Sequence, residues 1–314
     1  MRPRVASPTV LPILALSVLA LALTAAAGER YALVVGIDGY QTLGKLETCV
    51  ADAEGLRQVL VERAGFSEKR VALLTDKQAE QQNRPTLAML RERIRQVCSF
   101  AEQGDTVLIF FSGHGDMADA KSGEKKGYLI PLDGGTTLDE QGEMENAIPL
   151  SWLKQRLEEC KATHKVLILD TCHAGSATLG VGGVAGSLTS AVLLLSCGEK
   201  QVSHTDKDRG HSVFSQFLIE GLAGAADADK NKEITVAELF GFVKDRMKDW
   251  GMATGKTQTP LLSGEKAEAF AVARVPSDRP SEPRVEQPRP ELLPKHEELP
   301  RHEEPPRHEV RPPR

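Results

Sequence analysis

Residues 106–115 read TVLIFFSGHG, an apolar run rich in β-branched and aromatic residues that ends in small polar ones. An uninterrupted run of this kind predicts a strand that is buried on both faces. Similar apolar runs occur at 31–37 (YALVVGI), 165–169 (KVLIL) and 191–195 (AVLLL), with shorter ones at 71–74 and 128–131. We expect these runs to form the strands of one central sheet.

Stretches with helical spacing of apolar residues separate the predicted strands. They span residues 47–63, 85–100, 151–160, 211–222 and 235–248. Buried strands that alternate with helices predict an α/β fold with a mostly parallel central sheet and helices on both faces. In such sheets, ligands bind beyond the carboxyl ends of the strands, so this edge is where a functional site is expected.

Composition divides the 314 residues into three parts. Residues 1–27 have basic residues followed by an apolar run and three alanines, which is typical of a secretory signal peptide. We expect cleavage after about Ala27 and export to a periplasmic or extracellular location, with membrane contact only if this segment stays uncleaved as an anchor. Residues 28–274 form the predicted catalytic body, and residues 275–314, rich in Pro, Glu, Arg and His, predict a disordered tail.

Charge and cysteine content limit the classes of partner. A net charge of -5 and an aromatic content of 4% give no sign of a nucleic-acid partner. The five cysteines are an odd number, so at least one thiol stays unpaired. Three of them, Cys49, Cys98 and Cys160, lie on predicted helical faces, where a small buried hydrophobe is the usual role.

Two segments that directly follow buried strands carry the candidate chemistry. One holds His114 within Ser-Gly-His-Gly, and the other holds Cys172 within Asp-Thr-Cys-His-Ala-Gly-Ser. Carboxyl ends of parallel strands meet at one edge, so these two residues are expected to be neighbours. An imidazole can take the proton of a thiol and return one to a leaving amine. Glycines beside His114 are expected to let the backbone turn sharply and offer N–H groups to an oxyanion.

The residues alone leave two alternatives open. Cys197 also follows a buried strand and reaches the same edge, although Cys172 lies in the segment richer in small residues. His114 could be a purely structural turn histidine.

The two motifs, FFSGHG and LDTCHAGS, resemble those of the caspase-like cysteine peptidases (peptidase C14 type), nearest to the metacaspases and their bacterial relatives. The resemblance extends over about residues 30–248, and DTCHAG departs from the QAC[RQG]G signature of animal caspases. It implies a caspase-like three-layer sandwich and a cysteine-type endopeptidase, with Cys172 as nucleophile and His114 as base. A catalytically idle caspase-like scaffold that binds protein partners is the alternative function.

The resemblance also implies roles for other residues near the pair. The backbone N–H groups of Gly115 and Cys172 would form the oxyanion hole. Asp38, Asp170 and Ser112 would line an acidic pocket for a basic P1 residue, the Arg or Lys before the scissile bond, so the partners would be protein or peptide substrates. A turn cap is the alternative role of Asp38, and a strand-end hydrogen bond is that of Asp170.

An acidic loop from residue 227 to 238 carries a weaker signal. Asp227, Asp229, Asn231 and Glu238 occupy positions one, three, five and twelve of an EF-hand loop, but Lys232 stands at the sixth position, where glycine is usual. The favoured interpretation is a loop that caps the last helix, with calcium as the alternative. Residues 177–191 contain no Asp or Glu, which further disfavours calcium dependence, and no other cofactor is expected.

A flavodoxin-like binder of small molecules is a third reading of the same sheet. No Gly-rich phosphate loop follows any of the predicted strands, which disfavours it.

Overall fold

A computed structural model describes residues 28–119, 121, 125–172, 190–198, 201–206, 208–264 and 270–275. At Lys125 and Cys172 it describes the backbone alone. The predicted signal peptide and, beyond Val275, the predicted tail lie outside the described residues.

The centre of the molecule is a sheet in which the predicted strands lie side by side. Its six-strand path runs in the order β11-β7-β6-β3-β1-β2, and every neighbouring pair is parallel except β11 with β7. The strands are β1 (Arg30–Gly36), β2 (Val71–Thr75), β3 (Thr106–Asp119), β6 (His164–Cys172), β7 (Val192–Leu195) and β11 (Leu261–Ser263). The mostly parallel sheet is therefore confirmed, with β11 as an antiparallel edge strand that was not predicted.

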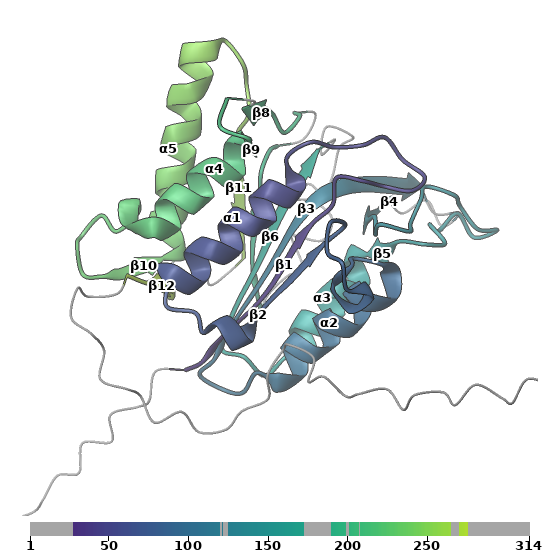
Figure 1. Cartoon of the computed structure of the whole chain (residues 1–314), viewed down its shortest axis with the longest axis horizontal. Helices are drawn as coiled ribbons and strands as arrows, with labels where there is room; N and C mark the ends of the chain where they lie inside the picture. The colour runs from purple at the N-terminus through teal and green to yellow at the C-terminus, as the bar shows by residue number, and fades with distance from the viewer. Residues whose placement is uncertain are drawn as a thin grey trace, which may run out of the picture.

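Helices cover both faces of this sheet, which confirms the three-layer architecture (Figure 1). One face carries α1 (Cys49–Glu62), α4 (Val213–Glu220) and α5 (Val236–Thr254), and the other carries α2 (Leu87–Phe100) and α3 (Leu150–Glu159). No helix in the described part of the chain combines the length and the apolar character needed to cross a bilayer.

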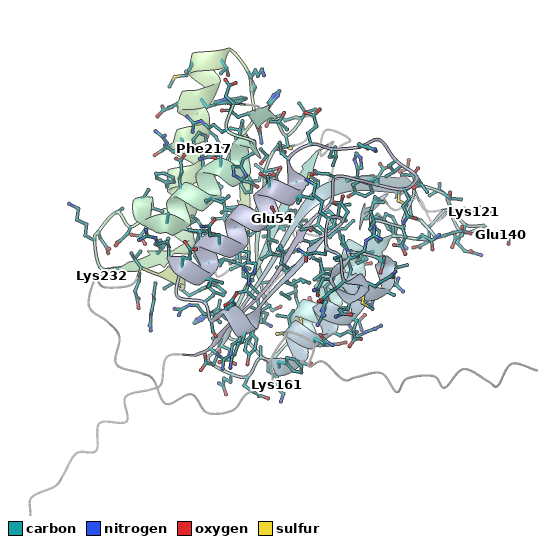
Figure 2. The ribbon with its side chains drawn as sticks, viewed as in Figure 1. Glu54, Lys121, Glu140, Lys161, Phe217 and Lys232 are labelled. Atoms are coloured by element: carbon teal, nitrogen blue, oxygen red, sulfur yellow. The ribbon has the colours of Figure 1, made fainter. Side chains whose placement is uncertain are left out.

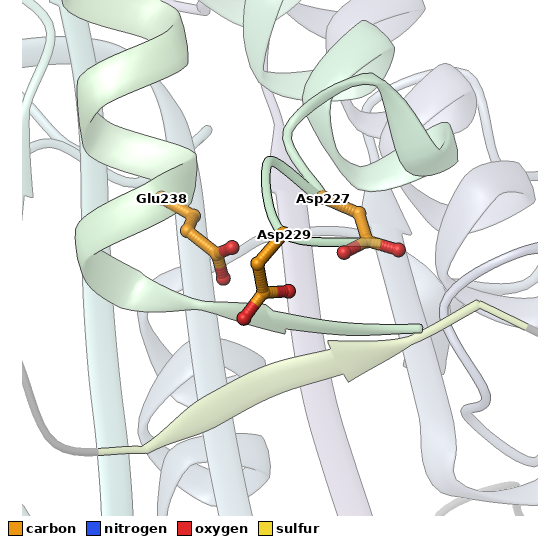
Figure 3. A group of neighbouring side chains, drawn as sticks. All are labelled: Asp227, Asp229 and Glu238. Carbon is orange, nitrogen blue, oxygen red and sulfur yellow. The ribbon is translucent and has the colours of Figure 1, made fainter. Parts of the chain in front are cut away.

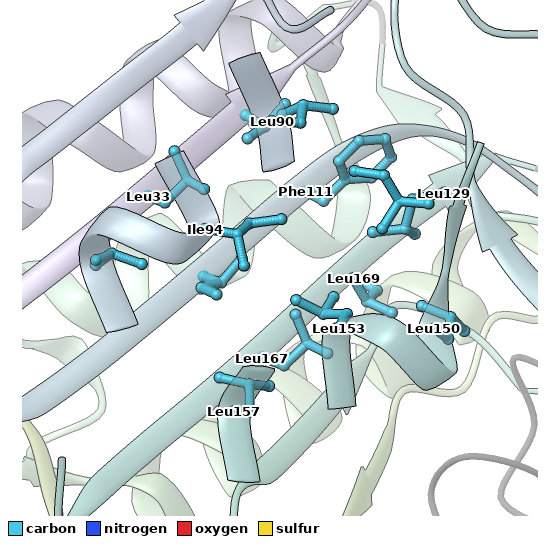
Figure 4. Packing of buried hydrophobic residues seen from close by; sticks show 14 of the residues in the cluster. Leu33, Leu90, Ile94, Phe111, Leu129, Leu150, Leu153, Leu157, Leu167 and Leu169 are labelled. Atoms are coloured by element: carbon cyan, nitrogen blue, oxygen red, sulfur yellow. The ribbon is translucent and has the colours of Figure 1, made fainter. Parts of the chain in front are cut away.

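Side chains that alternate between the two faces of each strand divide the hydrophobic core into two clusters. On β1, Leu33 and Val35 belong to the cluster beneath α2 and α3, whereas Ala32 and Val34 belong to the cluster beneath α1, α4 and α5. Figure 4 shows the first cluster, in which leucines of α3 pack against strand residues such as Leu167. Because successive strand side chains point to opposite faces, a continuously apolar strand has to be covered on both.

Shorter elements surround this frame, and most of them carry too little periodicity to be predicted. β4 and β5 extend the sheet beside the outer part of β3, and the other short strands form two separate antiparallel pairs. The short elements are β4 (Lys125–Leu129), β5 (Ile148–Pro149), β8 (Thr205–Asp206), β9 (His211–Ser212), β10 (Glu233–Thr235), β12 (Ala271–Arg274), η1 (Glu68–Arg70), η2 (Gln81–Asn83) and η4 (Gly221–Ala225).

One local prediction is wrong: the backbone does not turn sharply around His114. β3 continues to Asp119, pairing with β6 as far as His114 and with β4 from Gly115 onward. Gly113 is required by close packing, because a Cβ there would lie 2.4 Å from Tyr40 Oη. This part of β3 therefore projects beyond the end of β1, whose register with β3 ends at Gly36 and Ser112.

A second glycine, Gly36 at the end of β1, gives a stability prediction. A Cβ at this position would lie 2.1 Å from the backbone oxygen of Cys49 and 2.7 Å from the Cβ of Ala53. Gly36→Ala is therefore expected to lower the free energy of unfolding by about 1–3 kcal/mol, because helix α1 would have to move away from β1. Urea denaturation would measure the loss.

Gly241→Ala is the matched control, because nothing lies within 4 Å of a Cβ built on Gly241 in α5. Alanine in an unobstructed helical position should stabilise the protein slightly. Equal destabilisation by both substitutions would contradict the packing argument.

Candidate active site

The two candidate catalytic residues meet at the carboxyl edge of the sheet. In the register between β3 and β6, Ser112 is opposite Asp170, Gly113 is opposite Thr171, and His114 is opposite Cys172. Residues 58 positions apart in sequence are thus direct backbone neighbours through topology alone. The thiol of Cys172 and the loop that follows it lie outside the described residues. The backbone N–H groups of Gly115 and Cys172, which are predicted to form the oxyanion hole, belong to β3 and β6.

Backbone and side-chain contacts hold His114 in a defined orientation. Its Nε2 lies 2.7 Å from the carbonyl oxygen of Gly44, and its backbone N–H donates to Tyr40 Oη at 2.7 Å. The imidazole also packs against the Tyr40 ring, with centroids 4.6 Å apart and planes tilted by 52°. A carbonyl oxygen only accepts, so Nε2 carries a proton, and in the neutral imidazole the lone pair is therefore on Nδ1. This tautomer suits a general base that acts through Nδ1.

Cys197, the rival nucleophile, is placed one strand further away. It follows β7, and β6 separates β7 from the strand that carries His114. The Cys197 side chain is 2% exposed, and its thiol donates to the carbonyl oxygen of Gln201 at 3.5 Å. The arrangement of the strands therefore favours Cys172 as the partner of His114.

Asp170, two residues before Cys172, is buried among hydroxyl groups. Its Oδ1 accepts a hydrogen bond from Ser203 Oγ at 2.8 Å. Its Oδ2 accepts from Ser215 Oγ at 2.7 Å and also from Ser212 Oγ. Ser212 in turn caps the N-terminus of α4, since its hydroxyl accepts the backbone N–H of Ser215. Asp170 therefore ties the end of β6 to α4.

Asp52 is a site residue that the sequence analysis did not single out. It lies in the first turn of α1, is fully buried, and accepts hydrogen bonds from Ser112 Oγ (3.3 Å) and from the backbone N–H of Ser212 (3.0 Å). His211 Nδ1 lies 3.0 Å from its carboxylate. Burial raises the pKa of Asp52 to about 6, and the charge of Asp170 adds to this, while the hydrogen bond from His211 opposes it.

A signal for Asp52 was present in the sequence. It stands three residues after Cys49 and four before Leu56, on the face of α1 where the spacing calls for apolar residues. A charged residue on the buried face of a helix is unusual unless it is paired or functional.

Asp38 occupies a different environment from Asp170. Its carboxylate accepts the backbone N–H groups of Cys49 (2.8 Å) and Val50 (3.4 Å), so it caps the N-terminus of α1. Its nearest charged neighbours are Asp76 and Lys77, and burial raises its pKa despite the helix N–H groups. The structure thus brings Ser112 and Asp170 together with Asp52. Asp38 caps α1, and its predicted role in the pocket for a basic P1 residue stays a prediction.

The acidic loop before α5 gathers three carboxylates. Oxygen atoms of Asp227, Asp229 and Glu238 lie within 4.8 Å of one another (Figure 3). Glu238 also forms a capping box with Thr235, which agrees with the predicted capping of the last helix. Lys232 adopts a φ of 68°, the left-handed conformation that glycine usually supplies at this position, and its N–H donates to Asp227 Oδ2 at 3.0 Å.

The raised pKa of Asp52 predicts how stability depends on pH. A carboxyl whose pKa is higher in the folded state stabilises the fold most below its unfolded pKa of about 4, and this contribution disappears as the pH rises through about 6. The parent protein should therefore lose roughly 3 kcal/mol between these limits relative to Asp52→Asn. Urea denaturation from pH 4.5 to 7 would measure the difference.

Glu54→Gln is the control for this titration, because Glu54 is exposed on the same helix (Figure 2). Its pH profile should follow the parent. If Asp52→Asn also follows the parent, Asp52 is ionised as easily in the folded chain as in the unfolded one.

Comparisons with known proteins identify the family. Residues 29–270 match the family model described as the caspase domain, so this chain belongs to the caspase-domain family. It is 29% identical to metacaspase-1 of Schizosaccharomyces pombe over 157 residues, covering 48% of this chain and 35% of that protein. It is 24% identical to metacaspase-6 of Arabidopsis thaliana over 239 residues, covering 74% of this chain and 57% of that one.

A solved protein structure has an overall fold similar to that of this chain. A protein from Geobacter sulfurreducens aligns with a TM-score of 0.52 at 16% identity, covering 75% of this chain and 94% of that one. The chain spans about a third to just over half the length of the metacaspases that it matches.

Proposed function

We propose that this protein is a cysteine-type endopeptidase that hydrolyses peptide bonds through a dyad of Cys172 and His114. The observation that carries the proposal is the register that sets His114 opposite Cys172 at the carboxyl edge of the sheet. Two adjacent strands thus supply a nucleophile and a base, and Gly44 holds the base in the tautomer that the reaction needs.

In the proposed reaction, the Cys172 sulfur attacks the scissile carbonyl carbon as its proton passes to His114 Nδ1. Backbone N–H groups of Gly115 and Cys172 stabilise the oxyanion that forms. The imidazolium then protonates the leaving amine, which departs and leaves an acyl-enzyme. A water molecule, deprotonated by His114, hydrolyses the acyl-enzyme and regenerates the thiol. Apart from this water molecule, the proposed steps use only groups of the chain.

We infer that the substrate carries Arg or Lys before the scissile bond. The support is the buried negative charge of Asp52 and Asp170 beside Ser112, close in the sheet to Cys172. A cation that enters this pocket lowers the pKa of a carboxyl that burial alone raises, so binding is favourable. The side chain of His211, which contacts Asp52, would then share this carboxylate with the substrate.

A peptide panel tests this function against the alternative of an idle scaffold. Fluorogenic peptides ending in Arg, Lys or Asp would be incubated with the parent protein and with Cys172→Ala. The expected result is hydrolysis of the Arg and Lys peptides by the parent alone. Failure of the parent to cleave any of them would favour the scaffold, and efficient cleavage after Asp would refute the basic pocket.

We also propose that the 227–238 loop binds calcium weakly. The donor set is oxygen-only, as calcium prefers, and Asp227 Oδ1 is a buried oxygen without a hydrogen-bond partner in the described part of the chain. The residues that would hold the ion are Asp227, Asp229, Asn231 and Glu238, with Lys232 in the conformation that the loop requires.

Millimolar calcium is expected to raise the midpoint of thermal unfolding of the parent by a few degrees, because the ion binds the folded loop. Asp227→Ala should abolish the shift, whereas Asp245→Ala on α5 should retain it. A parent protein whose midpoint is the same with calcium and with a chelator would contradict the site.

Export is a further proposal, which rests on residues 1–27. Expression with this segment in a bacterial host should release a chain that begins just after Ala27, which intact-mass analysis would reveal. A protein retained with residues 1–27 intact would contradict cleavage.

A further inference from the structure

Two cysteines outside the proposed active site lie in contact between two helices. Cys98 is in the last turn of α2, and Cys160 is the residue that ends α3; both helices pack on the same face of the sheet (Figure 1). Their side chains are only 9% and 5% exposed, as expected of small buried hydrophobes. Burial is only part of their role, however, because both line the same cavity and each thiol shifts the pKa of the other.

The two thiols differ in acidity. Each is the largest influence on the other, and the pKa of Cys160 is lowered while that of Cys98 is raised. The Lys165 ammonium donates to the carbonyl oxygens of Leu157 and Cys160 at 2.8 Å each, so a positive charge is bound to the backbone of Cys160 itself, and it lowers the pKa of both thiols. Cys160 is therefore the stronger nucleophile of the pair.

A cavity of about 230 Å³ gives access to both cysteines. Besides the cysteines, it is lined by Arg95, Ser99, Arg156 and Glu159, of which Arg95, Ser99 and Glu159 are exposed. The cysteines are buried and the other lining residues form the rim, so a small molecule in the cavity lies against them.

The surroundings of this cavity carry a positive charge. The guanidinium groups of Arg91, Arg95 and Arg156 all lie 5.7–5.8 Å from the ring centre of Trp152 on α3. Glu159 pairs with Arg156 at 2.9 Å and offsets one of these charges. The remaining charge favours an anionic molecule in the cavity.

From these observations we propose that Cys98 and Cys160 form a dithiol site that reacts with small anionic disulfides and closes to a disulfide bond linking α2 to α3. The site lies on the face of the sheet that carries α2 and α3. It involves none of the residues proposed for peptide hydrolysis.

The proposed reaction is thiol–disulfide exchange in two steps. The Cys160 thiolate attacks one sulfur of the small disulfide, its S–S bond breaks, and one thiolate leaves and takes up a proton. The Cys98 thiol then loses its proton and attacks the Cys160 sulfur of the mixed disulfide, releasing the second small thiol. The protein dithiol loses two electrons, and the small disulfide gains them as two thiols.

Glutathione disulfide is the probe for this proposal, and Cys172→Ala is the background that removes the proposed catalytic thiol. Native protein would be incubated at neutral pH, quenched with an alkylating agent and mapped by mass spectrometry. The expected product is the Cys98–Cys160 disulfide, which a dithiol reductant reverses. In Cys98→Ser the first step should stop at glutathione attached to Cys160, and in Cys160→Ser the reaction should slow by at least about tenfold.

Charge selectivity and a control complete the test. Glutathione disulfide should react faster than cystamine, a cationic disulfide, and Arg95→Ala should reduce this preference. Cys197→Ser is the matched buried-cysteine control and should form the disulfide at the parent rate. With Cys172 intact, Cys98→Ser should keep full peptidase activity, so failure of this proposal is distinguishable from failure of the proposed function.

Two results would overturn the proposal. The first is a parent chain whose Cys98 and Cys160 are both still alkylated, after denaturation, following prolonged oxidation. The second, which needs no variant to fold, is a mapped mixed disulfide on Cys98 in the parent with Cys160 left as a thiol. A reaction rate with cystamine equal to or above that with glutathione disulfide would overturn the anionic specificity.

Discussion

Replacing Cys172 by alanine should lower kcat/KM for an Arg-P1 peptide by at least about 1,000-fold, and replacing His114 by alanine should do the same. Without the thiol no acyl-enzyme forms, and without the imidazole neither the thiol nor the leaving amine exchanges its proton. Members of a dyad act as a unit, so the double variant should be no worse than either single one. Hydrolysis of a fluorogenic peptide would measure all three.

Two controls accompany this experiment: one checks that the variants fold, and the other checks which cysteine is the nucleophile. Thermal unfolding of both variants should stay close to the parent, because His114 belongs to neither hydrophobic cluster and the change from cysteine to alanine removes a single sulfur atom. Cys197→Ala tests position: it removes the rival thiol beyond β7 and should keep most of the activity. If activity is lost in Cys197→Ala but kept in Cys172→Ala, the assignment of the nucleophile is wrong.

The second large effect concerns the acidic pocket. Asp52→Asn and Asp170→Asn should each lower kcat/KM for an Arg-P1 peptide by about 30-fold or more, since losing one partner of a buried charge pair costs roughly 2–5 kcal/mol. The most specific readout is the ratio of kcat/KM for Arg to that for citrulline, its neutral isostere. The parent should favour Arg strongly, and both variants should lose most of this preference.

Asp38→Asn distinguishes a role in the substrate pocket from a role as a helix cap. Because the Asp38 carboxylate accepts two backbone N–H groups of α1, its loss should lower stability by about 0.5–2 kcal/mol while leaving the ratio of Arg to citrulline near the parent value. A collapse of the ratio in Asp38→Asn, with Asp52→Asn unaffected, would show that Asp38 and not Asp52 receives the substrate cation.

Much of the fold could be predicted because its strands are continuously apolar. Runs such as TVLIFF and KVLIL place apolar side chains on both faces of a strand, and both faces must then be shielded from water. A parallel sheet between two layers of helices provides this burial. The same pattern predicted that His114 and Cys172 meet at one edge, and the register of β3 with β6 confirms that meeting. The short strands β8 to β12 were not predicted, because two to four residues carry no measurable period.

Predictions that depended on side-chain partners were less complete. Asp38 and Asp52 are both acidic residues near the start of α1, and only coordinates reveal that the first caps the helix while the second faces Ser112 and His211. The glycine at position 113 suggested a turn, yet its role is to make room for Tyr40 within an extended strand. Likewise, the contact between Cys98 and Cys160 joins residues from two helices whose packing the sequence does not specify.

The central claim, that His114 and Cys172 act together, is tested most directly by the rate at which Cys172 is alkylated. Iodoacetamide would be applied to the native parent and to native His114→Ala at neutral pH, and modification of the peptide containing Cys172 would be followed by mass spectrometry. An imidazole that shares the thiol proton increases the thiolate fraction. The account predicts fast alkylation in the parent and at least about tenfold slower alkylation in His114→Ala; equal rates in two folded proteins would contradict it.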